Sequence, residues 1–385
     1  MSWEKVKLGD LCEVITKGTT PSNIGETFTT EGVNYIRSEM LTSSKYISPN
    51  GMLYISNETH EKMKRSQLKK NDILFSMAGV YLGKTAILRD KDVPANTNQA
   101  VALIRIDSSK CNCEYVYYFL NVPKMVKTAN TVSSQSAQPN INLKQIGNLE
   151  IYLPSIKIQD TIVDILSDYD NLIENNQKQI KLLEEAAQRL YKEWFVDLRF
   201  PGYENTTITD GVPEGWDKKS LGEIVPVLTG KKDANFGTQD GKYPFFTCSQ
   251  EPIKAPIYSF DTSAVILAGN GDFNVKLYRG KFEAYQRTYV LSPDNLEHLY
   301  LLYHAVNSNM NKLVKGASGS TIKFLTKGMI ESIEILIPTE NVLLQFNQLM
   351  EEIQNKIEAL KKSVAYSTEA RDRLLPKLMS GEIEV

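Results

Sequence analysis

Few residues in this chain have the types and spacing that catalysis requires. His60, His298 and His304 are its only histidines, and none has the spacing of a metal ligand. The sequence has no GxxxxGKS/T phosphate loop, no GxGxxG turn, no NPPY-type amino-methyltransferase motif and no nuclease-like carboxylate–lysine pattern. The glycine-rich string around Gly269 and Gly271 follows a predicted strand with no helix signal behind it, and we interpret it as a turn. This lack of motifs favours a binding protein without a metal site over an enzyme.

The cysteines and the overall composition exclude further classes of protein. Cys111 and Cys113 are separated by one residue, which is not the usual zinc spacing, so we expect these two, Cys12 and Cys248 to be reduced thiols in a cytoplasmic protein. No apolar run approaches the roughly 18 residues of a membrane span, and the start MSWEKVKLGD lacks the apolar core of a signal peptide. With 44 Lys and Arg against 46 Asp and Glu, the net charge is −2. Any binding to nucleic acid must therefore use local basic patches.

The remaining candidates for chemistry are polar loops, and these occur in pairs. Residues 17–23 correspond to 230–237, residues 94–100 to 285–288, and residues 131–142 to 315–324. Amide and guanidinium groups can read base edges, while hydroxyls, Lys and backbone N–H groups hold phosphates. The candidate DNA-binding residues in the first half are Lys17, Thr19, Thr20, Ser22, Arg37, Lys84, Asn98, Gln99, Ser134, Gln135, Ser136, Gln138 and Asn140. Those in the second half are Lys231, Lys232, Asn235, Asn270, Gln286, Arg287, Lys315, Ser318, Ser320 and Lys323.

A solvated loop is the simplest interpretation of any one of these runs, and residues 60–70 add only a basic cluster. The paired occurrence is more informative, because equivalent loops share polar character and differ in their residues. That pattern is typical of two domains that read different sequences.

The elements that must position these loops include two long helices. Apolar or near-apolar residues alternate in steps of four and three, which is the seam of a coiled coil. The first seam comprises Ile162, Leu166, Tyr169, Ile173, Asn176, Ile180, Leu183, Ala187, Leu190 and Trp194. A second seam follows 184 residues later, at Phe346, Met350, Ile353, Ile357, Leu360, Val364, Ser367, Arg371 and Leu374. Each helix would be about 35–40 residues, or roughly 55–60 Å, long.

The seams also contain polar residues, at Asn176, Ser367 and Arg371. Asn176 is either tolerated drift or a residue that fixes the helix register. We expect Arg371 to extend its side chain out of the seam to solvent.

A second repeat marks the segments that precede the helices. Trp3, Leu8 and Gly9 recur 213 residues later as Trp216, Leu221 and Gly222, whereas Pro154 and Pro338 differ by 184, so the second copy is 29 residues shorter. We predict an α+β fold with two similar α/β domains, separated by two long antiparallel helices that form a coiled coil with pseudo-two-fold symmetry. The expected limits are 1–154 for the first domain, 155–197 for the first helix, 198–215 for a linker, 216–338 for the second domain, 339–380 for the second helix and 381–385 for a tail.

These features resemble the specificity subunit of type I restriction–modification enzymes. The resemblance rests on the opening WEKVKLGDLCEVITKGTTPS, its second copy PEGWDKKSLGEIVPVLTG, the strand–proline–long helix units at Pro154 and Pro338, and the terminal RLLPKLMSGEI. It covers essentially the whole chain, and the shortened second domain departs from it.

The resemblance implies a non-catalytic subunit with two target-recognition domains, each of which reads one half of a bipartite target in double-stranded DNA. It implies that the helices set the gap and bind two modification subunits, which use S-adenosylmethionine to methylate adenine. Restriction subunits that use ATP and Mg would join them, and this chain would need no cofactor. The alternatives are a nucleic-acid-modifying enzyme with a divergent active site and a scaffold that binds proteins at both ends.

Overall fold

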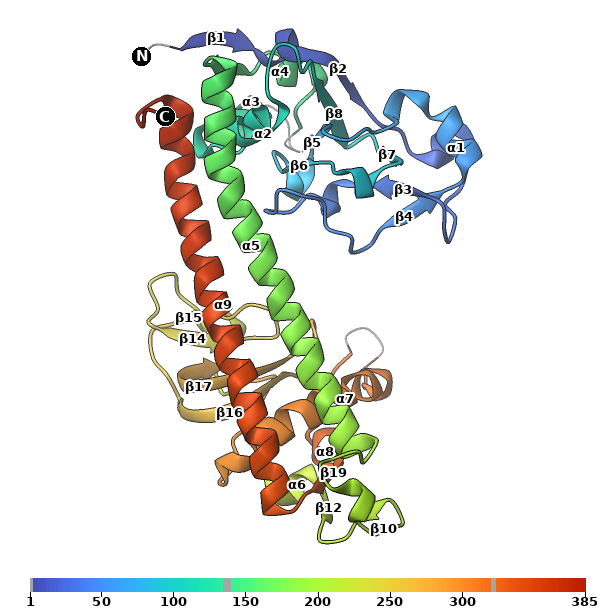
Figure 1. Cartoon of the computed structure of the whole chain (residues 1–385), viewed down its shortest axis with the longest axis vertical. Helices are drawn as coiled ribbons and strands as arrows, with labels where there is room; N and C mark the ends of the chain where they lie inside the picture. The colour runs from blue at the N-terminus through green and yellow to red at the C-terminus, as the bar shows by residue number, and fades with distance from the viewer. Residues whose placement is uncertain (1–2, 134–139, 320–322) are drawn as a thin grey trace. The chain divides into compact units, whose positions relative to one another are not determined.

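The computed structural model describes residues 3–133, 140–319 and 323–385, and the chain folds as two compact units (Figure 1). Unit 1 comprises Met1–Asn176 together with Lys362–Val385, and unit 2 comprises Gln177–Lys361. Each unit contains one part of each long helix, α5 (Ile156–Tyr191) and α9 (Glu340–Ser380). The fold is mixed α+β, as predicted.

Unit 1 contains two small sheets and a strand pair. An antiparallel four-stranded sheet has the order β2 (Cys12–Lys17), β8 (Val101–Ile106), β5 (Ile73–Ser76) and β6 (Thr85–Ile87). A three-stranded sheet has the order β4 (Leu53–Ile55), β3 (Val33–Ile36) and β7 (Ala95–Thr97). Strand β1 (Glu4–Lys7) pairs with β9 (Glu150–Leu153). The shorter helices are α1 (Asn57–Lys62), α2 (Cys113–Leu120), α3 (Pro123–Ser133) and α4 (Leu143–Gly147).

Unit 2 joins the equivalent strands into one sheet. Its order is β13 (Val227–Thr229), β18 (Thr288–Leu291), β16 (Phe260–Ala268), β17 (Val275–Ala284), β14 (Tyr243–Phe246) and β15 (Ile253–Ala255). The strand pairs are β12 (Asp217–Ser220) with β19 (Glu334–Ile337), and β10 (Ile208–Thr209) with β11 (Val212–Pro213). The shorter helices are α6 (Leu221–Ile224), α7 (Leu299–Gly316) and α8 (Lys327–Glu331).

The two units confirm the predicted internal repeat. Each copy of the repeat opens with a strand that pairs antiparallel with the last strand of its unit, β1 with β9 and β12 with β19. The next backbone N–H then donates to the chain just before that last strand, from Leu8 to Leu149 O and from Leu221 to Ile333 O, both at 2.8 Å. In unit 2, the single strand β17 pairs with β16 on one side and with β14 on the other. In unit 1, two separate strands make the equivalent pairs, β6 with β5 and β7 with β3. The continuous strand needs fewer residues, which accounts for part of the shorter second domain.

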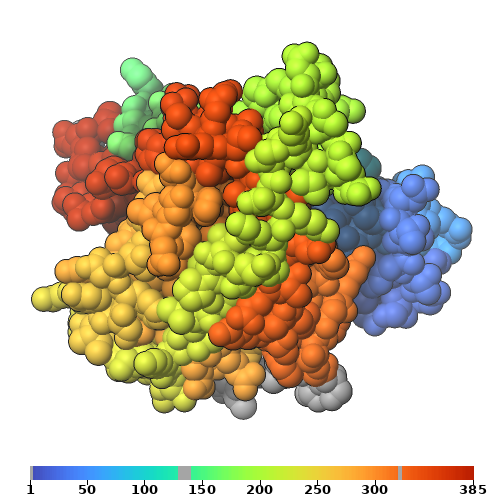
Figure 2. Space-filling model, turned by 90° about the horizontal axis from the view of Figure 1, so that it is seen from below, coloured from blue at the N-terminus to red at the C-terminus, as the bar shows by residue number. Residues whose placement is uncertain are grey.

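The segment that connects α5 to the sheet of unit 2 lies on the surface of that unit. A single π turn, Lys192–Val196, ends α5. Figure 2 shows the lime-coloured chain after it running over one face of unit 2 against orange segments. Phe200 and Trp216 nonetheless bury their rings in the core of unit 2, so this linker is attached at both ends.

Helices α5 and α9 pack against each other in both units, and every predicted seam residue is buried or half-buried. In unit 1, Ile162 and Leu166 near the start of α5 share a core with Leu375 and Leu378 near the end of α9. In unit 2, Trp194 directly after α5 shares a core with Phe346 near the start of α9. In each unit, therefore, the beginning of one helix meets the end of the other, which is the antiparallel arrangement predicted.

Two polar seam residues, Asn176 and Arg371, are bonded to the facing helix. Asn176 Nδ2 donates to Ser363 Oγ at 2.9 Å, which supports a role in helix register. The prediction for Arg371 was wrong, because its side chain is only 18% exposed and Nη1 lies 2.7 Å from Asp170 Oδ1. A buried carboxylate on the facing helix was available, and a guanidinium gains more from that partner than from extending to solvent.

Candidate nucleic-acid interface

In each unit, one glycine lets the first predicted loop lie directly against the second. Gly18 follows β2 and Gly230 follows β13, at equivalent places in the two units. A Cβ atom at Gly18 would lie 1.7 Å from Thr97 O, and one at Gly230 would lie 2.0 Å from Ala284 O. No side chain fits at either place, so residues 17–23 lie against 97–100, and residues 230–237 lie against 285–288.

Hydrogen bonds strengthen both junctions. In unit 1, Thr20 Oγ1 donates to Gln99 Oε1 at 2.6 Å, between two predicted site residues. In unit 2, the Gln286 N–H donates to Lys232 O at 2.9 Å.

The third pair of loops joins the same places through a turn in each sheet. We name residues 77–83, between β5 and β6, and residues 269–273, between β16 and β17, the tip turns. In unit 1, Met77 N donates to Ala100 O at 2.8 Å and Ile141 N donates to Met77 O at 3.0 Å. In unit 2, Gly269 N donates to Arg287 O at 2.9 Å and Leu325 N donates to Gly269 O at 2.7 Å. Each tip turn is thus held between two predicted loops, and the same backbone bonds do this in both units.

The predicted residues of unit 1 differ in their solvent exposure and in their side-chain partners. Lys17, Ser22, Gln99 and Asn140 are exposed, whereas Thr19, Thr20, Arg37, Lys84 and Asn98 are half-buried. Arg37 forms an ion pair with Glu39 at 2.8 Å, and Lys84 Nζ donates to Ser43 Oγ at 3.0 Å. Asn98 Oδ1 accepts from its own turn at Ala100 N. Ser134, Gln135, Ser136 and Gln138 lie outside the described residues.

The predicted residues of unit 2 form a more exposed set. Lys231, Asn235, Gln286, Arg287, Lys315, Ser318 and Lys323 are exposed, and Lys232 and Asn270 are half-buried. Lys232 Nζ lies 4.6 Å from the centre of the Phe236 ring. Ser320 lies outside the described residues.

Sequence reasoning missed two residues that share a hollow with these. Gln286 and Arg287 line a hollow of about 280 Å³ together with Thr326 and Lys327 at the start of α8. The signal was present in the sequence, since Thr326 caps α8 by accepting from Met329 N and so places Lys327 in the first turn.

Two lysines of the basic cluster of residues 60–70 form ion pairs within unit 1. Lys62 Nζ lies 2.7 Å from both Glu26 Oε1 and Glu58 Oε1, and Lys70 Nζ lies 2.7 Å from Asp90 Oδ2. These ion pairs make Lys62 and Lys70 less available to a phosphate.

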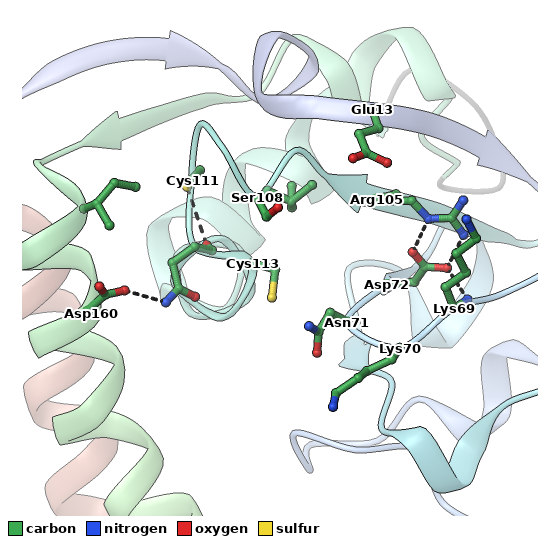
Figure 3. A pocket seen from close by; sticks show the side chains of 13 residues that line it. Glu13, Lys69, Lys70, Asn71, Asp72, Arg105, Ser108, Cys111, Cys113 and Asp160 are labelled. Atoms are coloured by element: carbon green, nitrogen blue, oxygen red, sulfur yellow. Dashed lines mark hydrogen bonds and ion pairs between the residues drawn. The ribbon is translucent and has the colours of Figure 1, made fainter.

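A pocket of about 450 Å³ in unit 1 lies beside the first turn of α5 (Figure 3). Arg105 and Asp72 face each other at 2.7 Å, and the hydrogen bonds that Arg105 donates to Asp72 raise the pKa of Arg105. Burial raises the pKa of the Cys111 thiol to about 12 and that of Cys113 to about 11, so neither forms the thiolate that a nucleophile needs. Among residues 3–133, 140–319 and 323–385, no group of three His, Cys, Asp or Glu could hold a metal ion. None of the helices described there is long and apolar enough to cross a membrane.

Comparisons with known proteins agree with this geometry. A family model described as the type I restriction modification DNA specificity domain matches residues 1–185 and 213–363. The chain is 28% identical over 419 residues to the MjaIX specificity subunit of Methanocaldococcus jannaschii, which covers 100% of this chain and 94% of the relative. It is 38% identical over 176 residues to the EcoDI specificity subunit of Escherichia coli, covering 45% and 39% of the two chains. The S subunit of a type I system from M. genitalium shares the fold, with a TM-score of 0.59, 17% identity and coverage of 98% and 96%.

Proposed function

The chain belongs to the DNA specificity subunits of type I restriction–modification systems, and on this premise we propose that each of its two domains reads one half of a bipartite DNA target. The observation that carries the proposal is that in each unit two polar loops hold one tip turn and a third polar loop lies against one of them. The backbone bonds that gather the loops are the same, while the exposed side chains differ. A shared frame with different polar groups suits two readers of different sequences.

The specificity subunit is the non-catalytic component, and we assign the chemistry to its partners. Two modification subunits would supply S-adenosylmethionine, and restriction subunits would supply ATP and Mg²⁺, in a cytoplasmic complex on double-stranded DNA. The net charge of the chain is −2, and Lys62, Lys70 and Arg37 are held in ion pairs. Tight binding should therefore need the modification subunits, which can add phosphate contacts around the duplex.

We propose that the long helices set the gap between the two half-sites and form the docking surface for the modification subunits. Residues 155–197 and 339–380 would act as the spacers between recognition domains 1–154 and 216–338. One heptad adds about 10 Å of helix, or roughly three base pairs of DNA rise.

Half-site selection tests the reading function. The reconstituted complex is offered a random DNA pool, and the selected sequences are compared for the wild type, Gln99→Ala in unit 1 and Arg287→Ala in unit 2. Each variant should alter or relax one half-site only, by about 1–3 kcal/mol at one base pair. The control is Asn175→Ala, at an exposed site on α5 outside both loop clusters.

A variant that changed both halves would contradict the modular assignment. Methylation of DNA by the purified chain without partners would instead favour the enzyme alternative.

Paired insertions test whether the helices set the gap. Seven residues added after Asn176 alone should leave the seam unmatched and destabilise the fold, whereas seven added to both helices at facing levels should restore packing and widen the gap by roughly three base pairs. A folded, partner-bound paired insertion with an unchanged gap would exclude this role of the helices.

A further inference from the structure

The two tip turns are built on the same backbone but carry different residues at their ends. Counted from the preceding strand, Ala78 corresponds to Asn270, Gly79 to Gly271 and Val80 to Asp272. Ala78 bridges to Asn140, and Asn270 bridges to Phe324, the equivalent position in unit 2. Gly79 and Gly271 both adopt left-handed backbone, with φ of 69° and 65°. The correspondence therefore holds in sequence, hydrogen bonding and backbone conformation up to Val80 and Asp272.

The residue after each of these glycines points away from the body of its unit. Val80 is 90% exposed, which is the largest value for any big apolar side chain in the described part of the chain. Asp272 is also exposed. Single exposed apolar residues are common on protein surfaces and usually need no explanation. Val80 differs from these because it lies between two predicted DNA-contacting loops.

Both turns are held rigidly, so these side chains are presented in a fixed place. In unit 1, Leu82 N donates to Gly79 O at 3.1 Å and Gly83 N donates to Ser76 O at 3.0 Å. In unit 2, the turn is two residues shorter, because Leu267 pairs with Val275 where Phe75 pairs with Thr85.

Side chains also brace the turn of unit 2. Asn274 Nδ2 donates to Asp272 O, and Lys276 Nζ donates to Ser249 O at 3.0 Å. Lys276 interacts electrostatically with the Asp272 carboxylate without covering it.

We propose that Val80 and Asp272 are a matched pair of base-reading residues, with Val80 contacting a thymine methyl group and Asp272 accepting a hydrogen bond from a cytosine amino group. The assignment follows from the groups that bases present in the major groove. Only thymine offers a methyl group there, and an apolar side chain contacts it. A carboxylate is an acceptor and matches the N4 amino group of cytosine. This inference rests on the proposed function and adds to it the chemistry of one base in each half-site.

Removing only the thymine methyl group tests Val80 directly. The reconstituted complex is bound to its selected target, and each thymine of the first half-site is replaced in turn by uracil. At one position the wild type should bind about fourfold more weakly, which is the effect of one buried CH2 group. Val80→Ala should bind the thymine target roughly three- to tenfold more weakly and should show no further loss with uracil. The control Leu172→Ala, at an exposed site on α5, should keep the full uracil effect.

A change of base tests Asp272. The complex with Asp272→Ala should bind the selected target on the order of tenfold more weakly and should accept any base at one position of the second half-site. Glu251→Ala removes another exposed carboxylate of unit 2 and should leave that preference intact.

The outcomes separate this inference from the function on which it rests. A first half-site without thymine on either strand, or uracil effects that persist in Val80→Ala, would overturn the role of Val80. A second half-site unchanged by Asp272→Ala would overturn that of Asp272. In both cases a bipartite target would still be selected, whereas failure to select any bipartite target would remove the proposed function itself.

Discussion

Unit 1 and unit 2 pack against the same two helices, α5 and α9, through different kinds of side chain. In unit 1, a chain of charges and hydroxyls connects the small helix α2 to α5 and α9. In unit 2, the equivalent region is filled by aromatic rings. The repeat therefore preserves the backbone arrangement of the helices while the side chains that hold it have diverged.

The polar chain of unit 1 runs through five side chains. Lys45 Nζ lies 2.6 Å from Glu114 Oε2 and donates to Tyr118 Oη at 3.1 Å. Tyr118 Oη donates to Asp170 Oδ2 at 2.6 Å, and Asp170 accepts from Arg371 on its other oxygen. Burial alone would lower the pKa of Arg371, but its hydrogen bonds to Asp170 raise that pKa overall. The guanidinium therefore stays charged, and alternating charges compensate for the desolvation that each one suffers.

The aromatic set of unit 2 centres on Phe346. The rings of Phe195, Trp194 and His304 lie with centroids 4.8, 5.8 and 6.1 Å from it. His304 stacks on Tyr191 and contacts Gln188 Oε1 through Nδ1 at 3.1 Å. Such a cluster gains from apolar burial and ring geometry, which salt does not screen.

Truncation of the Phe346 ring should lower the free energy of unfolding more than any other change considered. Phe346→Ala is expected to lower the free energy of unfolding by about 3–5 kcal/mol, because the ring is fully buried and leaves a cavity. Urea unfolding followed by the fluorescence of Trp194 and Trp216, both in this core, measures it. Leu344→Ala on the same helix is 52% exposed and is the matched control. A loss of less than 1 kcal/mol would show that unit 2 does not depend on its aromatic cluster.

Acid should weaken unit 2 through His304. Burial lowers the pKa of this imidazole to about 4 from its usual 6.5, so protonation favours the unfolded chain. The stabilising contribution is complete above about pH 6.5 and is lost as the pH falls towards 4, at a cost of about 3 kcal/mol. Thermal unfolding of the wild type and His304→Leu across that range should give a smaller slope for the variant. Parallel slopes would mean that other groups control the acid response.

Breaking the polar chain of unit 1 should cost somewhat less. Asp170→Asn is expected to destabilise the protein by about 2–3 kcal/mol, below the value for a fully buried pair because Arg371 keeps Asp372 as a second partner. Replacing both partners, as Asp170→Leu with Arg371→Met, should recover most of this loss in denaturant unfolding. Asp168→Asn is the exposed control. If the double variant were no better than the single one, the pair would contribute more than its own desolvation.

The smallest effect is expected at Asn176, where the other helix has Leu360 in the equivalent seam position. Asn176→Ala should cost about 1 kcal/mol through the lost bond to Ser363. Asn176→Leu should cost less, because new apolar burial offsets that loss. Asn175→Ala should leave the unfolding midpoint unchanged, and an equal shift in all three variants would argue against a specific role for the bond.

Patterns that repeat along the chain could be predicted, whereas contacts between distant irregular segments could not. The heptad positions from Ile162 to Leu374 are all buried or half-buried because helical periodicity is local. Lys45 escaped notice because it lies in irregular chain between β3 and β4, and only the folded unit brings it to Tyr118. The partner of Arg371 depended on the crossing of two helices that are about 200 residues apart in sequence.

The site shows the same limit. Corresponding polar runs predicted the loops, and the string around Gly271 was correctly interpreted as a turn. The position of this string and of Val80 between two loops depends on the register of β5 with β6 and of β16 with β17. The sequence around a single valine in a turn does not predict that the folded chain places it between two loops.

The division of α9 between the units also determines which unit is synthesised completely first. The core of unit 1 includes Leu375, Leu378 and Met379, which are synthesised after every residue of unit 2. Domains generally fold from the N-terminus as the chain emerges. Here the contiguous segment Gln177–Lys361 is complete before unit 1, whose core still lacks the last part of α9. Although most of unit 1 is synthesised first, its core can therefore be completed only after the last part of α9 has been made.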